Sequence, residues 1–183
     1  RQSRDVAEEK LWSLMQHNIQ SVYNLVEKVS TYEPELHMVR LSSDLLPCYT
    51  EAKWGEIWQR SDVQNYAERE FAKVGELARK NDVRLSFHPG QFTVLASDKP
   101  DVVERSIEEF EYHVNMARWM GYGKYWQDLK INVHISGRKG AEGIIQVLHR
   151  LSPEARNTLT IENDEMCWGL DESLKLKDKV ALV

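Results

Sequence analysis

Cysteine is scarce in this sequence of 183 residues, which has only Cys48 and Cys167, far apart in the chain. Two such cysteines form neither a disulfide framework nor the paired spacing of a zinc knuckle. We therefore expect both to be reduced packing residues. The chain also lacks a run approaching the roughly 18 apolar residues of a membrane span. Its first residues lack the apolar core of a signal peptide, so we expect an intracellular, cytoplasmic protein with no membrane partner.

Positive charge is not in excess either: 24 Lys and Arg face 29 Asp and Glu, for a net charge of −5. This balance argues against a protein that coats nucleic acid through bulk electrostatics. It leaves local recognition open, because a bound metal ion adds positive charge that the formal count omits. The composition, 42% hydrophobic and 29% charged residues, is that of a globular chain able to bury a real core.

Apolar residues recur at helical spacing from Val6 to Val29 and predict a long amphipathic helix. Short apolar runs bounded by Gly, Pro, Asn and Asp predict strands. Residues 48–61 form a long connection, and its aromatic residues either cover the mouth of a barrel or line a ligand groove. Further helices are expected over about 62–80, 101–120, 142–151 and 171–177, and strands over 36–41, 84–88, 130–134, 158–162 and 180–183.

Alternating strands and helices imply parallel strands joined by right-handed crossovers, hence an α/β fold. We favour a TIM barrel, (β/α)8, because chemistry on this fold gathers at the C-terminal ends of several strands. About five strands with flanking helices are visible, whereas the closed barrel needs about eight. The sequence opens with a helix and ends within a strand. We therefore expect residues 1–183 to be the central part of a single barrel domain whose first and last strands are absent.

Three successive strands end in residues that can bind metals: His88 before Pro89-Gly90, His134, and Glu162. Barrel geometry brings neighbouring strand ends to one rim, and imidazole with carboxylate is the ligand set of zinc, manganese and iron sites. A lone histidine at a strand end is more often structural, so the hypothesis depends on all three together. Asn132 lies two residues before His134 on the same face and is expected to support a ligand. The remaining histidines are predicted to have surface or packing roles.

Four segments together resemble the UV damage endonucleases, and the similarity runs in the family's order through nearly the whole chain. The His-Pro-x-Gln-aromatic motif and the Glu-Asn-Asp motif are specific to that family. The segments are Arg40–Pro47, Phe87–Leu95, Asn132–Gly137 and Leu159–Asp164.

The resemblance implies a metal-dependent DNA repair enzyme on a TIM barrel that incises the phosphodiester bond 5′ to a UV photoproduct and leaves a 3′-hydroxyl. His88, His134 and Glu162 match the family's metal ligands, with Glu162 as a bridging carboxylate and with His134 and Glu162 in catalysis. Gln91 and Phe92 match the pair that enters the duplex to probe the lesion, where the family often has tyrosine. The implied cofactor is Mn²⁺, with Zn²⁺ or Mg²⁺ as alternatives. The implied partner is damaged double-stranded DNA, bound by a monomer that is nucleoid-associated if bacterial.

The chain also departs from the family. A glycine-tyrosine motif of the first strand is absent, and an Asp-His-His cluster is expected just after Val183. Many relatives carry a metal-binding histidine near Glu51, and here Cys48, Glu51 or no residue takes its place. Ser43 and Asn163 are additional site candidates. With ligand positions absent, we expect the chain as given to bind metal poorly and to be inactive by itself.

Two other interpretations stay open at this point. One is a sugar isomerase or epimerase of the xylose-isomerase-like barrels, which also gather His, Glu and Asp around divalent metals. The other is a non-catalytic truncated fragment that only folds, or that binds DNA without cutting it. The Gln91-Phe92 pair and the Ser42–Asp44 segment favour the repair enzyme.

Overall fold

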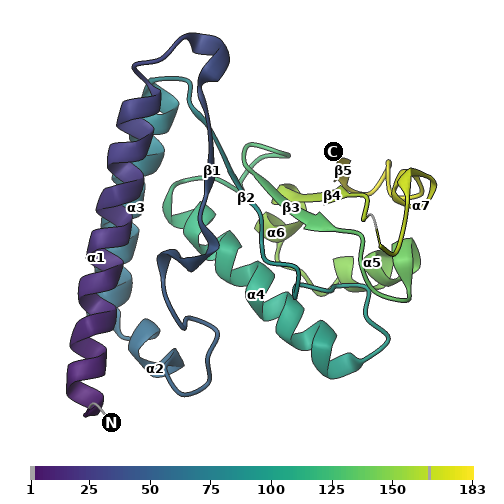
Figure 1. Cartoon of the computed structure of the whole chain (residues 1–183), viewed down its shortest axis with the longest axis horizontal. Helices are drawn as coiled ribbons and strands as arrows, with labels where there is room; N and C mark the ends of the chain where they lie inside the picture. Colours follow the sequence, from purple (N-terminus) through teal and green to yellow (C-terminus); the bar gives the residue numbers. More distant parts are fainter. Residues whose placement is uncertain (1–2, 165) are drawn as a thin grey trace. The chain divides into compact units, whose positions relative to one another are not determined.

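The computed structural model describes residues 3–164 and 166–183, in which helices and strands alternate along the chain (Figure 1). None of the helices in these residues has both the length and the apolarity that a membrane span requires. The helices are α1 (Arg4–Val29), α2 (Gly55–Trp58), α3 (Ser61–Lys80), α4 (Pro100–Trp119), α5 (Gly140–Leu148), α6 (Pro153–Thr158) and α7 (Leu170–Leu174), with 3-10 turns η1 (Pro34–Leu36) and η2 (Ser43–Leu45). The strands are β1 (Met38–Leu41), β2 (Arg84–Phe87), β3 (Lys130–His134), β4 (Leu159–Glu162) and β5 (Ala181–Leu182).

The strands in the described residues form a five-stranded sheet in the order β1-β2-β3-β4-β5. Strands β2 to β5 pair in parallel, with Phe87 opposite Ile131 and His134 opposite Glu162. Parallel strands in sequence order, joined by helices, are the architecture that the sequence predicts. A TIM barrel closes with about eight strands. These five do not close and so form part of an incomplete barrel.

The chain divides into two compact units by its internal packing. The first runs to Leu85 and includes Trp119–Gly121, and the second comprises Ser86–Arg118 and Tyr122–Val183. The first unit contains α1, β1, α2 and α3. The second contains most of α4, then β3, α5, α6, β4, α7 and β5. His88, His134 and Glu162 all belong to the second unit, so their geometry is defined within one body.

Two long helices, α1 and α3, dominate the first unit and contact each other along their length (Figure 1). α1 begins after Ser3, whose Oγ accepts the Val6 N–H at 3.4 Å and caps the helix. α3 carries Gly75 where a Cβ would lie 1.9 Å from the backbone oxygen of Met120, so only glycine fits there. The buried face of α1 consists of Leu11, Met15, Ile19, Val22, Val26 and Val29, which is the helical spacing that the sequence predicts.

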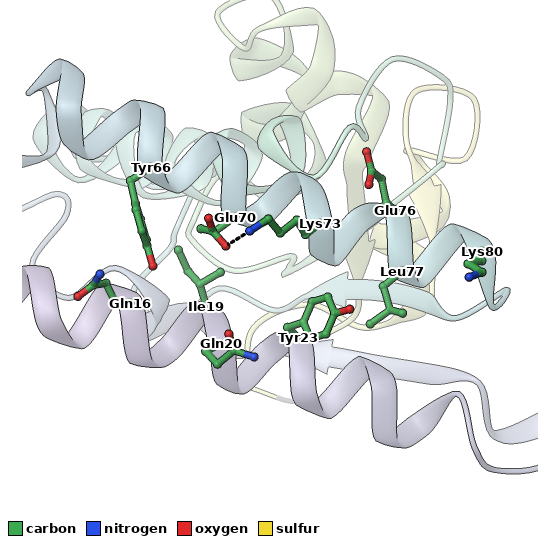
Figure 2. Close-up of a pocket in the computed structure, with 10 residues that line it drawn as sticks. All are labelled: Gln16, Ile19, Gln20, Tyr23, Tyr66, Glu70, Lys73, Glu76, Leu77 and Lys80. Carbon is green, nitrogen blue, oxygen red and sulfur yellow. Dashed lines mark hydrogen bonds and ion pairs between the residues drawn. The ribbon is translucent and has the colours of Figure 1, made fainter.

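A groove of about 370 Å³ opens between α1 and α3, and we call it the helix groove. Figure 2 shows Glu70 and Lys73 of α3 joined within it. The Glu70 carboxylate accepts hydrogen bonds from Lys73 Nζ at 2.6 Å and from Arg69 Nε at 2.8 Å. These hydrogen bonds, that from Lys73 first, hold the pKa of Glu70 below its ordinary value. The groove is lined by Gln16, Ile19, Gln20, Tyr23, Tyr66, Glu70, Lys73, Glu76, Leu77 and Lys80.

The core of the second unit is built from alternate residues of β3 and β4 and the inner face of α4. His113 of α4 is fully buried, and its ring lies edge-on to Phe87, with centroids 5.5 Å apart. This is the packing role that the sequence predicts for His113. The apolar residues of this core include Phe110, Val114, Met116, Ile131, Val133, Leu159 and Ile161.

Two expectations about the connecting segments are corrected. No helix was predicted between residues 151 and 158, but α6 starts there, because Ser152 Oγ accepts the Ala155 N–H at 3.1 Å and Pro153 suits a first helical turn. Cys48 and Cys167 are both exposed and not packing residues. Cys48 lies at φ 61°, in a turn that directs its side chain to solvent.

Two aromatic residues of the connection 48–61 pack against each other. Trp58, at the end of the short helix α2, is 2% exposed. Its ring lies against Tyr49, with centroids 5.8 Å apart. Trp58 is thus a packed residue of the first unit. A covering role for the segment at the barrel mouth stays a prediction.

Candidate metal centre

Each candidate ligand is placed by the end of a strand. β2 ends at the buried Phe87 and the chain continues into His88, β3 ends at His134, and β4 ends at Glu162. In β3 the side chains of Ile131 and Val133 are buried, so the intervening residues face the other side of the sheet. Because His134 pairs directly with Glu162 in the parallel register, the imidazole and the carboxylate are cross-strand neighbours.

The three side chains converge on one carboxylate oxygen. His88 Nε2 lies 2.6 Å from Glu162 Oε1, and His134 Nε2 lies 3.2 Å from the same atom. The two imidazole rings lie edge to face, with centroids 5.1 Å apart. One potential ligand atom from each of the three residues lies within 4.8 Å of the other two. The predicted convergence of His88, His134 and Glu162 is confirmed.

The hydrogen-bond partner of His88 fixes the direction of its lone pair. His88 Nδ1 lies 3.0 Å from the carbonyl oxygen of Pro89, which can only accept, so Nδ1 carries the hydrogen. In the neutral imidazole, Nε2 then points its lone pair at the carboxylate of Glu162. Two electron-rich atoms at this separation attract only with a proton or a cation between them.

The donor set therefore fits a divalent metal ion. Neutral imidazole nitrogen and carboxylate oxygen bind zinc, manganese and iron. The side chains of His88, His134 and Glu162 are 21%, 30% and 22% exposed, so the position is partly shielded yet open to solvent. Three protein ligands with an open side are typical of catalytic metal sites, which keep a position for water or substrate.

Gln91 and Phe92 occupy the tip of a tight turn beside His88. The Thr93 N–H donates to the Gly90 carbonyl at 2.9 Å and closes the turn around them. Phe92 is 85% exposed, so it projects from the loop as predicted instead of packing into the core. Gly90 closes this turn without a positive φ.

The other predicted residues are placed less decisively. Asn132 shares the face of His134, and its Oδ1 is buried with no hydrogen-bond partner in the described residues. Asn163 is exposed next to Glu162. Ser43 lies in η2 and Glu51 is exposed in the following loop, and both belong to the first unit. Roles for these four residues in the site stay predictions.

Asp164 is a neighbour of the site that the sequence reasoning did not single out. Its Oδ2 lies 4.0 Å from His134 Nδ1, on the side of the ring away from Glu162. The signal was its position two residues after Glu162 at the end of a strand. Its orientation depends on the loop that follows, which no periodicity describes.

Comparison with known families gives a match over the whole chain. A family model described as UV-endonuclease UvdE matches residues 1–183. A UV DNA damage endonuclease of Clostridium perfringens is 27% identical, over 97% of this chain and 42% of the relative. The UV DNA damage endonuclease of Bacillus mycoides is 28% identical, over 96% of this chain and 55% of the relative. A UV-damage endonuclease of Schizosaccharomyces pombe is 30% identical, over 91% and 28%. The chain thus spans between 28% and 55% of the length of these relatives.

A solved structure shares the same fold. The crystal structure of SacUVDE superposes with a TM-score of 0.82 at 23% identity, over 96% of this chain and 59% of that chain. The superposition covers nearly all of the helices and strands described above. It agrees with the expectation of an incomplete TIM barrel.

Proposed function

Since the chain belongs to the UV-endonuclease UvdE family, we propose that it is the central part of a single TIM-barrel domain that cuts DNA at sites of UV damage. The observation that carries this proposal is the convergence of two imidazole nitrogens on the Glu162 carboxylate, at 2.6 Å and 3.2 Å. The proposed partner is damaged double-stranded DNA, bound by a monomer inside the cell.

In this proposal His88, His134 and Glu162 hold a divalent ion, with Mn²⁺ as the first choice and Zn²⁺ or Mg²⁺ as alternatives. A bound divalent ion lowers the pKa of a coordinated water and offsets charge on a phosphodiester. His88 is oriented by Pro89 so that its Nε2 faces the ion position. Glu162 presents a second carboxylate oxygen, which suits the bridging role implied for it. The proposed cut is 5′ to the photoproduct and leaves a 3′-hydroxyl.

Gln91 and Phe92 are proposed to probe the lesion. An exposed phenylalanine on a closed turn presents an apolar wedge to a duplex, and entry between bases costs a few kcal/mol in unstacking. That cost is smallest where a photoproduct has already disturbed the stack. Phe92 follows the ligand His88 by four residues, so a base pair opened by the wedge would lie near the proposed ion position.

The xylose-isomerase-like alternative is not favoured, because the whole chain matches the UvdE family. An exposed aromatic tip beside the site also suits a duplex better than a small sugar, which is bound in an enclosed pocket. The non-catalytic fragment is an outcome of the test that follows.

The test uses an end-labelled duplex with one UV photoproduct and the same duplex undamaged, incubated with Mn²⁺. Two proteins are compared: the 183-residue chain, and its reading frame extended on both sides to the length of the relatives. We expect the extended protein to cut immediately 5′ to the lesion and the shorter chain to cut weakly or not at all. The Glu162→Gln variant of the extended protein is the matched negative control. An extended protein that leaves the damaged duplex uncut, or that converts ketoses instead, contradicts the proposal.

A further inference from the structure

We propose that Asp164 is a positioning residue that holds the Nδ1 hydrogen of His134 and so keeps Nε2 as the metal-binding nitrogen. This inference rests on the proposed function, since it concerns the orientation of one of the proposed ligands. Asp164 is the last residue of the Glu-Asn-Asp motif, and it lies outside the proposed ligand triad of His88, His134 and Glu162.

The need for such a partner comes from His134 itself. Its Nδ1 is buried and has no hydrogen-bond partner in the described residues. A buried polar group without a partner costs about 1–3 kcal/mol. In His88 the corresponding atom, Nδ1, has a partner, because it lies 3.0 Å from the carbonyl oxygen of Pro89. Asp164 Oδ2 lies 4.0 Å from His134 Nδ1.

The Asp164 carboxylate is already held in place by its other oxygen. Oδ1 accepts the backbone N–H groups of Met166 at 2.7 Å and Cys167 at 2.9 Å. The Asp164 N–H donates to the carbonyl of Trp168 at 2.9 Å. The indole N–H of Trp168 in turn donates to the Gly137 carbonyl at 2.7 Å, just beyond the end of β3. Oδ2 is left facing His134, and the Asp164 side chain is only 16% exposed.

This geometry favours orientation of the ligand over direct ligation. Oδ1 is engaged by two N–H groups, and Oδ2 faces Nδ1, whereas Glu162 faces Nε2. The separation of 4.0 Å is longer than a hydrogen bond, and a small rotation of the ring or the carboxylate closes it. A carboxylate behind a ligating imidazole fixes the position of its hydrogen and raises its basicity, and losing it costs roughly 10–100-fold in metal affinity.

The substitution Asp164→Asn separates this role from the loop anchor. The asparagine oxygen can still accept from Met166 and Cys167, but the amide nitrogen would present N–H groups to His134 Nδ1. Nδ1 then becomes the acceptor, and the hydrogen moves to Nε2, which can no longer bind metal. Asp164→Ala removes both functions, and Asp178→Asn, at an exposed position, controls for the loss of one negative charge.

The first readout is the ¹⁵N chemical shift of His134 Nδ1 in the metal-free protein, recorded above the ordinary imidazole pKa of about 6.5. We expect Nδ1 to carry the hydrogen in the wild type and in Asp178→Asn, and to lose it in Asp164→Asn. The second readout is Mn²⁺ affinity by electron paramagnetic resonance, expected to fall roughly 10–100-fold in Asp164→Asn.

The outcomes separate the two proposals. Unchanged Nδ1 protonation in Asp164→Asn overturns the inference, even with weaker Mn²⁺ binding, because a direct ligand would behave in that way. The inference is also overturned if Mn²⁺ affinity falls in Asp164→Ala but not in Asp164→Asn. In that case the lost hydrogen bonds from Met166 and Cys167 explain the effect. If the wild-type protein extended to the length of its relatives binds no Mn²⁺, the metal site of the proposed function is contradicted, while the ¹⁵N shift still decides the role of Asp164.

Discussion

The helix groove of the first unit and the strand-end cluster of the second, which consists of His88, His134 and Glu162, differ in what surrounds their carboxylates. In the helix groove, the Glu70 carboxylate accepts a hydrogen bond from Lys73 (Figure 2) and another from Arg69. In the cluster, the Glu162 carboxylate faces the Nε2 atoms of two histidines. The groove is a hollow of about 370 Å³, yet its Glu70 carboxylate is already paired with Lys73 and Arg69. A set of metal-ligand atoms that converge from three strand ends indicates chemistry better than the volume of a hollow does.

The largest difference should appear when one carboxylate in each region is neutralised. Glu162→Gln should weaken Mn²⁺ binding by more than about 100-fold, since a ligand is lost and not only a supporting contact. Glu70→Gln, the matched change in the helix groove, should leave Mn²⁺ affinity unchanged. Calorimetric titration of both variants measures this. Equal losses in the two variants would mean that general acidity and not the cluster attracts the ion.

The exposed aromatic tip beside the cluster gives the next effect. In the protein extended to the length of its relatives, Phe92→Ala should weaken binding to damaged duplex roughly 5- to 150-fold, because one base–aromatic contact contributes about 1–3 kcal/mol. Binding to undamaged duplex and the metal content should change little. Tyr125→Ala, at a residue 75% exposed in another loop of the same unit, is the control and should have no effect. Equal losses on both duplexes would show that Phe92 does not read the lesion.

The first unit should depend on close packing instead of on charge. Gly75→Ala places a methyl group 1.9 Å from the Met120 backbone oxygen, which cannot yield as a side chain would. Overpacking of this kind lowers the free energy of unfolding by about 1–3 kcal/mol. Gly55→Ala, where nothing lies within 4 Å, should be close to neutral. Urea unfolding compares the two. A neutral Gly75→Ala would show that α3 can move away from the Met120 backbone without cost.

The smallest effects are expected from the surface carboxylates. The pKa of Glu172 is lowered, chiefly by its hydrogen bond from Lys175 and then by that from the Ala141 N–H. Glu172 should therefore stabilise the fold above its ordinary pKa of about 4.3 and lose this contribution as the pH falls through the lower folded value. Glu172→Gln should cost under about 1 kcal/mol near neutral pH, because the pair with Lys175 is at the surface.

Unfolding in urea at neutral and at acid pH measures this difference. The gap between Glu172→Gln and the wild type should shrink on acidification. The gap for Glu70→Gln should shrink in the same direction, since the pKa of Glu70 is lowered by the same kind of hydrogen bond. A gap that grows as the pH falls would reverse the assigned direction of the pKa shift.

The strand ends of the site could be predicted from the sequence because they follow simple periods. The alternation around His134 placed its side chain opposite the buried Val133, and the parallel order of strands brought Glu162 beside it. The Pro and Gly residues that follow His88 correctly indicated the end of β2. These are local rules of strand geometry, and tertiary packing did not override them.

The features that were missed depend on loop conformation. The place of Asp164 follows from backbone donors of Met166 and Cys167, which no spacing rule reveals. Cys48 was expected to pack, but a backbone φ of 61° turns that segment outwards. A Ser-Pro pair can follow the end of one helix or cap the start of the next. Here the Ala155 N–H donates to Ser152 Oγ, so Ser152 caps the start of α6.

The measurement that tests the metal site most directly is an anomalous diffraction map from crystals soaked in Mn²⁺. We predict a peak enclosed by His88 Nε2, His134 Nε2 and Glu162 Oε1, with ligand distances of about 2.0–2.3 Å. The helix groove should show no peak, because Lys73 and Arg69 already neutralise Glu70. A strong peak at the groove together with none among the three donors would contradict the assignment of this cluster as the metal centre.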